Sequence, residues 1–253
     1  MKTLLSVRKI FFTVISASIL LLLVTACDKN NDNNNDQPIS GLMAFNLAPD
    51  KAVNISLSGN YISTLPISYS NYTGGYYAIY SGTRPVESFD ANTGASLDMD
   101  SYNFENDQYY SLFVVGANGN YHNIITHDNF DSITATSGQA YVRYINAIAD
   151  STDPLVSVMA NGSETVNENS SFGNISEFTA VPAGDITINV NGGATIDASR
   201  TISVEERKLY TVLLLGIPGS TTASDSLQIR YVVNGTLDQD AAKMSSINSM
   251  DVD

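Results

Sequence analysis

Apolar and polar side chains alternate along most of this chain, and this period of two constrains the fold more than any other feature. Ile186, Ile188 and Val190 share one face of a predicted strand, whereas Thr187 and Asn189 occupy the other. Such alternation is typical of a half-buried β-strand, and no window shows the spacing of an amphipathic helix. The sequence therefore predicts an all-β fold.

The clearest predicted strands lie in the second half of the chain, where short turn signals separate them. Asn161-Gly162 and the Asn-Gly-Gly turn at 191–193 supply residues that tolerate a positive φ. The predicted strands span residues 141–147, 155–160, 175–181, 185–190, 195–204, 208–216 and 227–233.

The same layout of residues occurs twice, at an offset of about one hundred residues. YSLFVVG at 110–116 recurs as YTVLLLG at 210–216, and Asn46 recurs as Asn146. Two units of this size, each with about seven strands, suit immunoglobulin-like or transthyretin-like β-sandwiches.

We therefore predict two tandem β-sandwich domains, at residues 39–131 and 138–237. An acidic C-terminal tail at 238–253 follows them. A single large sandwich is the competing interpretation.

A basic and then apolar leader precedes the predicted domains. Three basic residues are followed by a nearly unbroken apolar stretch at 10–23, which is the layout of a secretory signal. The leader ends at Val24-Thr25-Ala26-Cys27, which contains the one cysteine of the chain. This tetrapeptide resembles the lipobox of bacterial lipoproteins. The resemblance implies that residues 1–26 form a lipoprotein signal peptide and that lipid chains on Cys27 anchor the protein in a membrane.

Asparagine and aspartate dominate the segment DKNNDNNND at 28–36, which has nothing to bury. We predict that residues 27–38 form a disordered, flexible tether. An aspartate directly after Cys27, followed by such a tract, also resembles lipoproteins of Bacteroidetes-type bacteria. That resemblance implies display on the outer face of the outer membrane, and the periplasmic face is the alternative.

The chain is strongly acidic, with a net charge of −14. Removal of the leader leaves nine basic residues against 26 acidic ones, a net charge of −17. Such a surface repels nucleic acid and anionic headgroups, so the lipid anchor is the expected membrane contact. Once Cys27 is lipidated, no cysteine is left for a disulfide.

The second predicted unit resembles a family of secreted bacterial β-sandwich domains, domain of unknown function 4397. The resemblance rests on AYVRYINAIAD at 140–150, VPAGDITINV at 181–190 and KLYTVLLLGIPG at 208–219. The first unit resembles a diverged copy that keeps NLAPD at 46–50 and YYSLFVVG at 109–116. The family implies β-sandwich domains but no established activity.

Few residues suited to catalysis are present. Histidines occur only at 122 and 127, and we expect them on the surface of a hairpin. Motifs for a nucleophile elbow, a metalloprotease helix or a phosphate-binding loop are missing. We predict a non-enzymatic protein without a cofactor, and a carboxylate-dependent hydrolase is an alternative.

Two weak signals concern modification and metal binding. Asp90, Asp98 and Asp100 suggest a calcium site, because hard cations prefer several oxygen ligands. The competing interpretation is a charged edge strand that resists aggregation. Asp-Ser-apolar or Asp-Ser-Thr patterns, which resemble the O-glycosylation acceptor pattern of Bacteroidetes, place candidate sites at Ser132, Ser151 and Ser226.

Several tyrosines crowd around a Gly-Gly pair. Tyr69, Tyr72 and Tyr76 form a candidate ligand-binding platform, because exposed tyrosine rings stack on sugars and their hydroxyls form hydrogen bonds. The sequence thus predicts a non-catalytic outer-membrane or cell-surface lipoprotein that binds a protein or glycan ligand or has a structural role. The alternative is a glycan-binding lipoprotein of a polysaccharide-uptake system.

Overall fold

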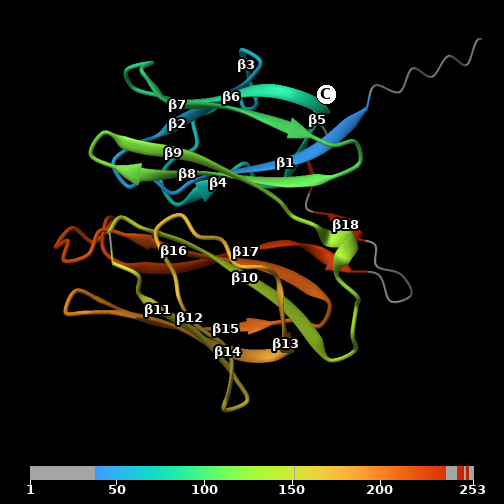
Figure 1. The fold of residues 1–253 in the computed structure, drawn as a ribbon, viewed down its shortest axis with the longest axis vertical. Coiled ribbons are helices and arrows are strands. Elements are labelled where there is room, and N and C mark those ends of the chain that lie inside the picture. Colours follow the sequence, from blue (N-terminus) through green and yellow to red (C-terminus); the bar gives the residue numbers. More distant parts are fainter. Residues whose placement is uncertain (1–37, 151, 238–243, 248, 251–253) are drawn as a thin grey trace, which may run out of the picture. The chain divides into compact units, whose positions relative to one another are not determined.

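The computed structural model describes residues 38–150, 152–237, 244–247 and 249–250, and nearly every element is a β-strand (Figure 1). The predicted signal peptide, Cys27 and nearly all of the predicted tether lie outside the described residues. The all-β prediction is confirmed, as is the prediction of two tandem sandwiches. Among the described residues, no helix has the length and apolar character needed to span a bilayer.

The first repeat contains two sheets, which we call its inner and outer sheets. The inner sheet has the order β19-β5-β1-β8-β9 with β4 beside β1, and the outer sheet has the order β3-β2-β6-β7. Inner strands are β1 (Ile39–Asn46), β4 (Asn71–Tyr72), β5 (Tyr76–Tyr80), β8 (Tyr109–Ala117) and β9 (Asn120–His127); outer strands are β2 (Val53–Leu57), β3 (Asn60–Tyr61), β6 (Gly82–Asp90) and β7 (Ser96–Phe104).

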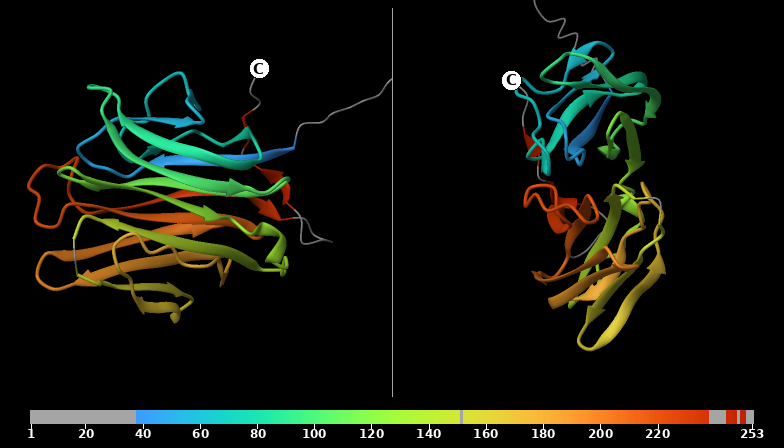
Figure 2. Two further views of the ribbon diagram at one scale, coloured as in Figure 1. Left: turned by 45° about the horizontal axis from the view of Figure 1, so that its top comes forward. Right: turned by 90° about the vertical axis from the view of Figure 1, so that its left-hand side faces the viewer.

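The second repeat has the same arrangement of an inner and an outer sheet. Figure 2 gives two further views of the fold. A single 3-10 turn, η1 (Phe130–Ser132), precedes it. Its inner sheet has the order β13-β10-β16-β17-β18 and its outer sheet the order β12-β11-β14-β15. Inner strands are β10 (Gln139–Ile148), β13 (Thr179–Pro182), β16 (Lys208–Gly216), β17 (Gln228–Leu237) and β18 (Met244–Ile247); outer strands are β11 (Leu155–Ala160), β12 (Ser163–Asn169), β14 (Gly184–Gly192) and β15 (Ile196–Val204). The short strand β19 (Ser249–Met250) pairs with β5 of the first repeat.

The two repeats match strand for strand around a parallel pair. In the first repeat β1 pairs in parallel with β8 and antiparallel with β5. In the second, β10 pairs in parallel with β16 and antiparallel with β13. The internal repeat detected in the sequence therefore corresponds to a repeated topology.

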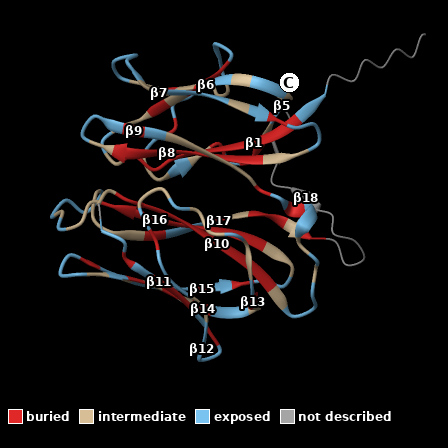
Figure 3. Ribbon diagram, in the orientation of Figure 1, coloured by how far each residue is buried: buried red, intermediate tan, exposed pale blue. Residues whose placement is uncertain are grey.

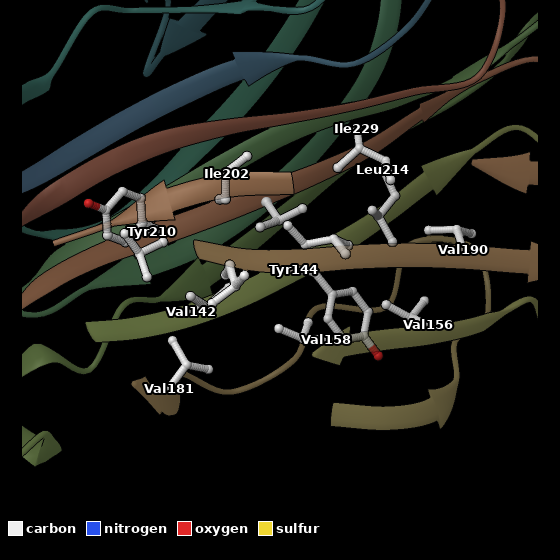
Figure 4. Close-up of a cluster of buried hydrophobic side chains, with 14 of the residues drawn as sticks. Val142, Tyr144, Val156, Val158, Val181, Val190, Ile202, Tyr210, Leu214 and Ile229 are labelled. Carbon is white, nitrogen blue, oxygen red and sulfur yellow. The ribbon is translucent and has the colours of Figure 1, made fainter. Parts of the chain in front are cut away.

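Alternation along the outer strands produces the core of each sandwich. On β14, Ile186, Ile188 and Val190 are buried while the residues between them are at least partly exposed. They pack against β10 side chains such as Val142 and Tyr144 in the core of the second repeat (Figure 4). Burial of each such side chain contributes about 1.5–3 kcal/mol, so these alternating strands provide much of the stability.

The central inner strands are buried on both faces (Figure 3). One face packs on the outer sheet of the same repeat, and the other joins a third hydrophobic cluster that contains residues of both repeats. Phe45 and Phe113 of the first repeat and Ile145, Leu209 and Leu213 of the second lie in that cluster. Continuous apolar runs are typical of strands covered on both sides, which explains why these strands do not alternate.

A buried asparagine closes the end of the first strand in each repeat. The Oδ1 atoms of Asn46 and Asn146 each accept a hydrogen bond from the backbone N–H two residues ahead, at 3.0 and 3.1 Å. Their amide nitrogens donate to the backbone oxygens of Ile67 and Ser170. The recurrence of this asparagine in the sequence therefore reflects a shared turn, since buried polar groups need partners.

A tyrosine closes the turn before the next central strand in both repeats. The Tyr110 hydroxyl accepts a hydrogen bond from the Glu105 backbone N–H at 2.8 Å, and the Tyr210 hydroxyl accepts one from Glu205 at 2.9 Å. This geometry resembles the tyrosine corner of immunoglobulin-like sandwiches.

Strands β12, β18 and β19 were not predicted from the sequence, and one predicted strand begins later than expected. Strand β12 was not predicted, because it is a polar edge strand whose residues are mostly exposed. The strand predicted at 175–181 begins only at Thr179, and Ile175 makes an isolated bridge to Ile145. Part of the segment described above as an acidic tail forms β18, which pairs with β17, and β19.

Candidate functional site

A buried ion pair joins the two repeats. Arg143 Nη2 of β10 lies 2.6 Å from Asp128 Oδ1, directly after β9, and the two residues are 3% and 1% exposed. The Arg143 guanidinium also lies 4.6 Å from the centre of the Phe178 ring. Removing both charges from water is costly, so the pair is stable only if further hydrogen bonds satisfy both groups.

Hydrogen bonds close a ring around this ion pair. Tyr76 donates from its hydroxyl to Asp128 Oδ2 at 2.5 Å and accepts a bond from Asn234 Nδ2 at 3.0 Å. Thr211 Oγ1 donates to Asn234 Oδ1 at 2.6 Å and accepts a bond from Arg143 Nε at 2.9 Å. The ring returns to its starting residue with every member almost fully buried.

Ser111 of β8 braces the centre of the ring. Its hydroxyl donates to Asp128 Oδ2 at 3.0 Å and accepts a bond from Arg143 Nη2 at 2.8 Å. The first repeat therefore supplies Tyr76, Ser111 and Asp128, and the second supplies Arg143, Thr211 and Asn234. We call these six residues the inter-repeat network.

The network occupies equivalent positions in the two repeats. The strand registers align Ser111 with Thr211 and Asp128 with Asn234, and the two hydroxyls donate to their own repeat's Asp or Asn. The same registers place Met43 where the second repeat has Arg143. The two repeats therefore share the polar pattern but differ in charge: Asp128 of the first is equivalent to the neutral Asn234, and Arg143 of the second is equivalent to the neutral Met43.

Burial keeps the Tyr76 hydroxyl protonated. Loss of solvation raises the pKa of Tyr76 well above its usual value, and the adjacent Asp128 carboxylate raises that pKa further. The hydroxyl therefore remains a hydrogen-bond donor at physiological pH. The network is shielded from solvent, and its groups bond to one another, with Asp128 Oδ1 held by the ion pair alone. Its chemistry therefore suits rigid attachment of the repeats.

The sequence contains one signal for this network, at Arg143. Arg143 interrupts an otherwise apolar strand, AYVRYINAI, that is buried on both faces. A charged residue at such a position requires a buried partner. The identity of Asp128 as that partner follows only from the contact between the repeats.

The tyrosines predicted to bind a ligand lie at the contact between the repeats. Tyr76 is 2% exposed and part of the network, so it contributes no open ring face, and the expectation of an exposed platform containing it is wrong. Tyr72 stacks on Phe45, with ring centres 5.5 Å apart. Tyr69 packs at the margin of the shared cluster, and burial raises the pKa of its hydroxyl to about 12. Tyr69 and Tyr72 are partly buried, and both pack against the cluster shared by the two repeats.

The candidate calcium ligands do not converge. Asp90 forms an ion pair with Lys51 at 3.1 Å, whereas Asp98 accepts a bond from the Asn123 backbone N–H at 2.6 Å. Asp100 accepts a bond from the next backbone N–H. Among the described residues, no three acidic or histidine side chains come together as metal ligands, so the calcium alternative gains no support from side-chain geometry. The Lys51 ammonium and the Asn92 backbone N–H lower the pKa of Asp90, with the N–H the larger cause.

The remaining candidate residues lie apart from one another. Ser132 is exposed in η1, and the Ser226 hydroxyl donates to the Ala223 backbone oxygen at 3.0 Å. Ser151 lies outside the described residues. His122 is exposed on β9, and His127 Nε2 lies 2.8 Å from Gln108 Oε1.

Besides a hollow lined by Asn71 and the candidate residue Tyr72, among others, two hollows with charged side chains open on the described surface. One lies at the turns of the first repeat and is lined by Asp50, Lys51, Asp90 and Tyr121, among others; Tyr121 donates its hydroxyl to Asp50. The other, of about 780 Å³, lies between β15 and β17 of the second repeat and is lined by Arg200 and Tyr231, among others. Arg200 and Arg230 give this second hollow two positive side chains, and Asp197 gives it one negative side chain.

Two sandwiches that share a buried core define a tandem β-sandwich protein. The chain belongs to the family described as "Domain of unknown function (DUF4397)", whose model matches residues 40–153 and again 140–248. The predicted resemblance is therefore confirmed for both repeats.

Other comparisons give only distant similarity. No curated protein matches the chain. The Bacillus anthracis TIE protein is 10% identical with a TM-score of 0.25 over 72% of this chain, which spans only 34% of that protein's length. CBMbc, a family CBM26 module from Eubacterium rectale Amy13K solved with maltoheptaose, is 10% identical with a TM-score of 0.23, covering 76% of this chain and 96% of its own.

Proposed function

We propose that this protein is a non-catalytic lipoprotein of the bacterial outer membrane, anchored through Cys27 and facing the cell exterior. Its two sandwiches act as one rigid module that binds a partner or supports an assembly at the envelope. The Val24 to Cys27 motif and the acidic tract behind it support the anchor and its Bacteroidetes-type sorting.

The observation that carries this proposal is the inter-repeat network. All six of its polar side chains are buried and bonded to one another across the two repeats. A module held in one geometry from within leaves its loops and strand edges free for recognition. Rigid presentation also lowers the entropy lost on binding.

The lipid anchor is tested by metabolic labelling with a clickable palmitate. We expect label on the wild-type protein and its recovery in the membrane fraction, and loss of both in Cys27→Ser. A Ser132→Ala variant serves as the control, because it changes a hydroxyl residue away from the motif. Unchanged labelling and fractionation of Cys27→Ser would exclude the lipoprotein assignment.

The orientation of the protein is tested by protease treatment of intact cells. Display on the outside predicts digestion without lysis, with a periplasmic protein remaining intact as the control. Protection on intact cells followed by digestion after lysis would instead place the protein on the periplasmic face.

A further inference from the structure

The open side of the second sandwich, between β15 and β17, carries two arginines on a strongly acidic protein. Arg200 of β15 and Arg230 of β17 both line the hollow there, together with Gln228 and Tyr231. The chain carries a net charge of −14. Neither arginine belongs to an ion pair within the described residues. Asp197 also lines the hollow, but it forms no described ion pair with either arginine. Two arginines against one carboxylate leave the hollow with excess positive charge, which suits an anionic ligand.

Arg200 is held in place at this opening. By alternation along β15, Arg200 lies on the same face of the strand as the buried residues Ile202 and Val204. Its Nη1 donates to the Ile229 backbone oxygen at 2.6 Å. Its guanidinium carbon lies 5.4 Å from the centre of the Tyr231 ring. Its Nε and Nη2 groups make no hydrogen bond within the described residues, and together they form the fork that binds a carboxylate in a bidentate manner.

Arg230 lies on the opposite face of β17. Ile229 and Val233 of this strand pack in the second repeat's core, whereas Val232 packs in the cluster shared with the first repeat. Because side chains alternate along a strand, Arg230 shares the face of Val232. Arg230 Nε donates to Gln228 Oε1 at 3.0 Å. The edge of β17 is thus flanked by one arginine on each face.

The backbone edge between these arginines is open. Strand β18 covers the outer edge of β17 only opposite Gly235–Leu237, and no other described strand pairs with that side. The Ile229 carbonyl reaches Arg200, so it points to this outer edge. In an antiparallel strand both backbone groups of a residue point the same way, and alternate residues point alike. The backbone groups of Tyr231 therefore also face outward.

We propose that this edge binds an extended acidic peptide as an added β-strand, continuing the side of β17 that β18 already occupies. Main-chain hydrogen bonds to β17 supply the docking, and carboxylates on the two faces of the peptide meet Arg200 and Arg230. This inference rests on the binding role proposed above and names its class of partner.

The same geometry favours a peptide over an acidic glycan. Successive side chains of a strand point to opposite faces, which matches arginines placed on opposite faces of one edge. The ring of Tyr231 already has the Arg200 guanidinium against it, so its stacking surface is partly taken. A glycan supplies no ladder of backbone donors and acceptors for the open strand edge.

Fluorescence anisotropy on the full chain in detergent tests the proposal. The probe is a short fluorescein-labelled peptide in which pairs of glutamates alternate with pairs of threonines, so that carboxylates lie on both faces of the extended strand. We expect binding that weakens about tenfold or more in Arg200→Gln and in Arg230→Gln. The matched control is Arg84→Gln. Arg84 also covers a tyrosine ring, at 5.4 Å, and donates to a backbone oxygen, but it lies in the first repeat.

A second probe tests the strand pairing without altering the protein. The same peptide, N-methylated at every residue so that neither edge can donate, is expected not to bind. Equal binding of the methylated peptide, or of both arginine variants, would overturn the proposal. Binding of an oligogalacturonate but not of the peptide would assign the site to a glycan instead. None of these outcomes depends on lipid labelling, so failure here is distinguishable from failure of the anchor.

Discussion

Replacing Asp128 by Asn removes the one negative charge that faces Arg143 across the repeats. The guanidinium would remain buried at 3% exposure beside neutral partners only. Breaking a buried ion pair from one side costs about 3–5 kcal/mol, because the remaining charge loses its partner without regaining water. We expect Asp128→Asn to lower the free energy of unfolding by about this amount.

The double variant Asp128→Asn/Arg143→Met separates this cost from a general packing effect. Methionine is the residue that the first repeat has at the equivalent position, Met43, which is fully buried in the same shared cluster. With both charges removed, no unpaired charge is left in the interior. We expect the double variant to be more stable than the sum of the single changes predicts, with a coupling energy of about 2 kcal/mol or more.

Urea unfolding followed by circular dichroism measures all of these free energies. The control is Lys208→Met, which breaks the solvent-exposed ion pair with Glu205 at 2.7 Å and is expected to cost about 1 kcal/mol or less. The reasoning is refuted if Asp128→Asn costs no more than this control. Single changes that add within about 0.5 kcal/mol would also refute it.

Three further predictions concern packing, backbone and pH. Leu213→Ala, in the cluster shared by the repeats, should cost about 2–5 kcal/mol and leave a single calorimetric transition; two separate transitions would show that the repeats unfold independently. Gly216→Ala should lower the melting temperature, because φ is +119° and a Cβ there would lie 2.5 Å from the Ser226 backbone oxygen; Gly59→Ala, with open space around it, is the milder control. The buried tyrosines should destabilise the fold in alkali, because burial raises the pKa of Tyr69 and of Tyr144 to about 12 in the folded protein. The free energy of unfolding that these neutral hydroxyls contribute is fully present below about pH 10, the pKa of an exposed tyrosine, and is lost as the pH rises toward about 12. Absorbance at 295 nm should report their ionisation together with unfolding, and ionisation near pH 10 in the folded protein would contradict this.

The network explains how two similar sandwiches become one module. Shared apolar residues alone, such as Phe113 and Leu213, give a non-directional contact between the inner sheets. The Asp128–Arg143 ion pair and its hydrogen bonds are directional. They fix how the two inner sheets lie against each other, because a shift of one sheet along the other would leave a charge unpaired in the interior. We attribute the relative placement of the inner sheets to these polar groups and the stability of the contact to the apolar ones.

Much of the fold was predictable where local chemistry decides it. Strands β11 and β16 have the bounds that the sequence predicts, because turn residues flank each of them. The polar edge strand β12 was not predictable, since an exposed strand beside β11 carries little hydrophobic pattern. The burial of Tyr76 was not predictable for a related reason: its hydroxyl meets Asn234 only when the second repeat packs against the first.

The sequence by itself determined the all-β class, the duplication and the acidic character of this protein. Alternation, turn residues and recurring motifs act over a few residues, so they are readable along the chain. Tertiary structure alone decided which strands are covered on both faces and which carboxylate meets Arg143. It also decided that Arg200 and Arg230 flank one open edge. These features depend on contacts between residues far apart in the chain, and no local pattern encodes such pairings.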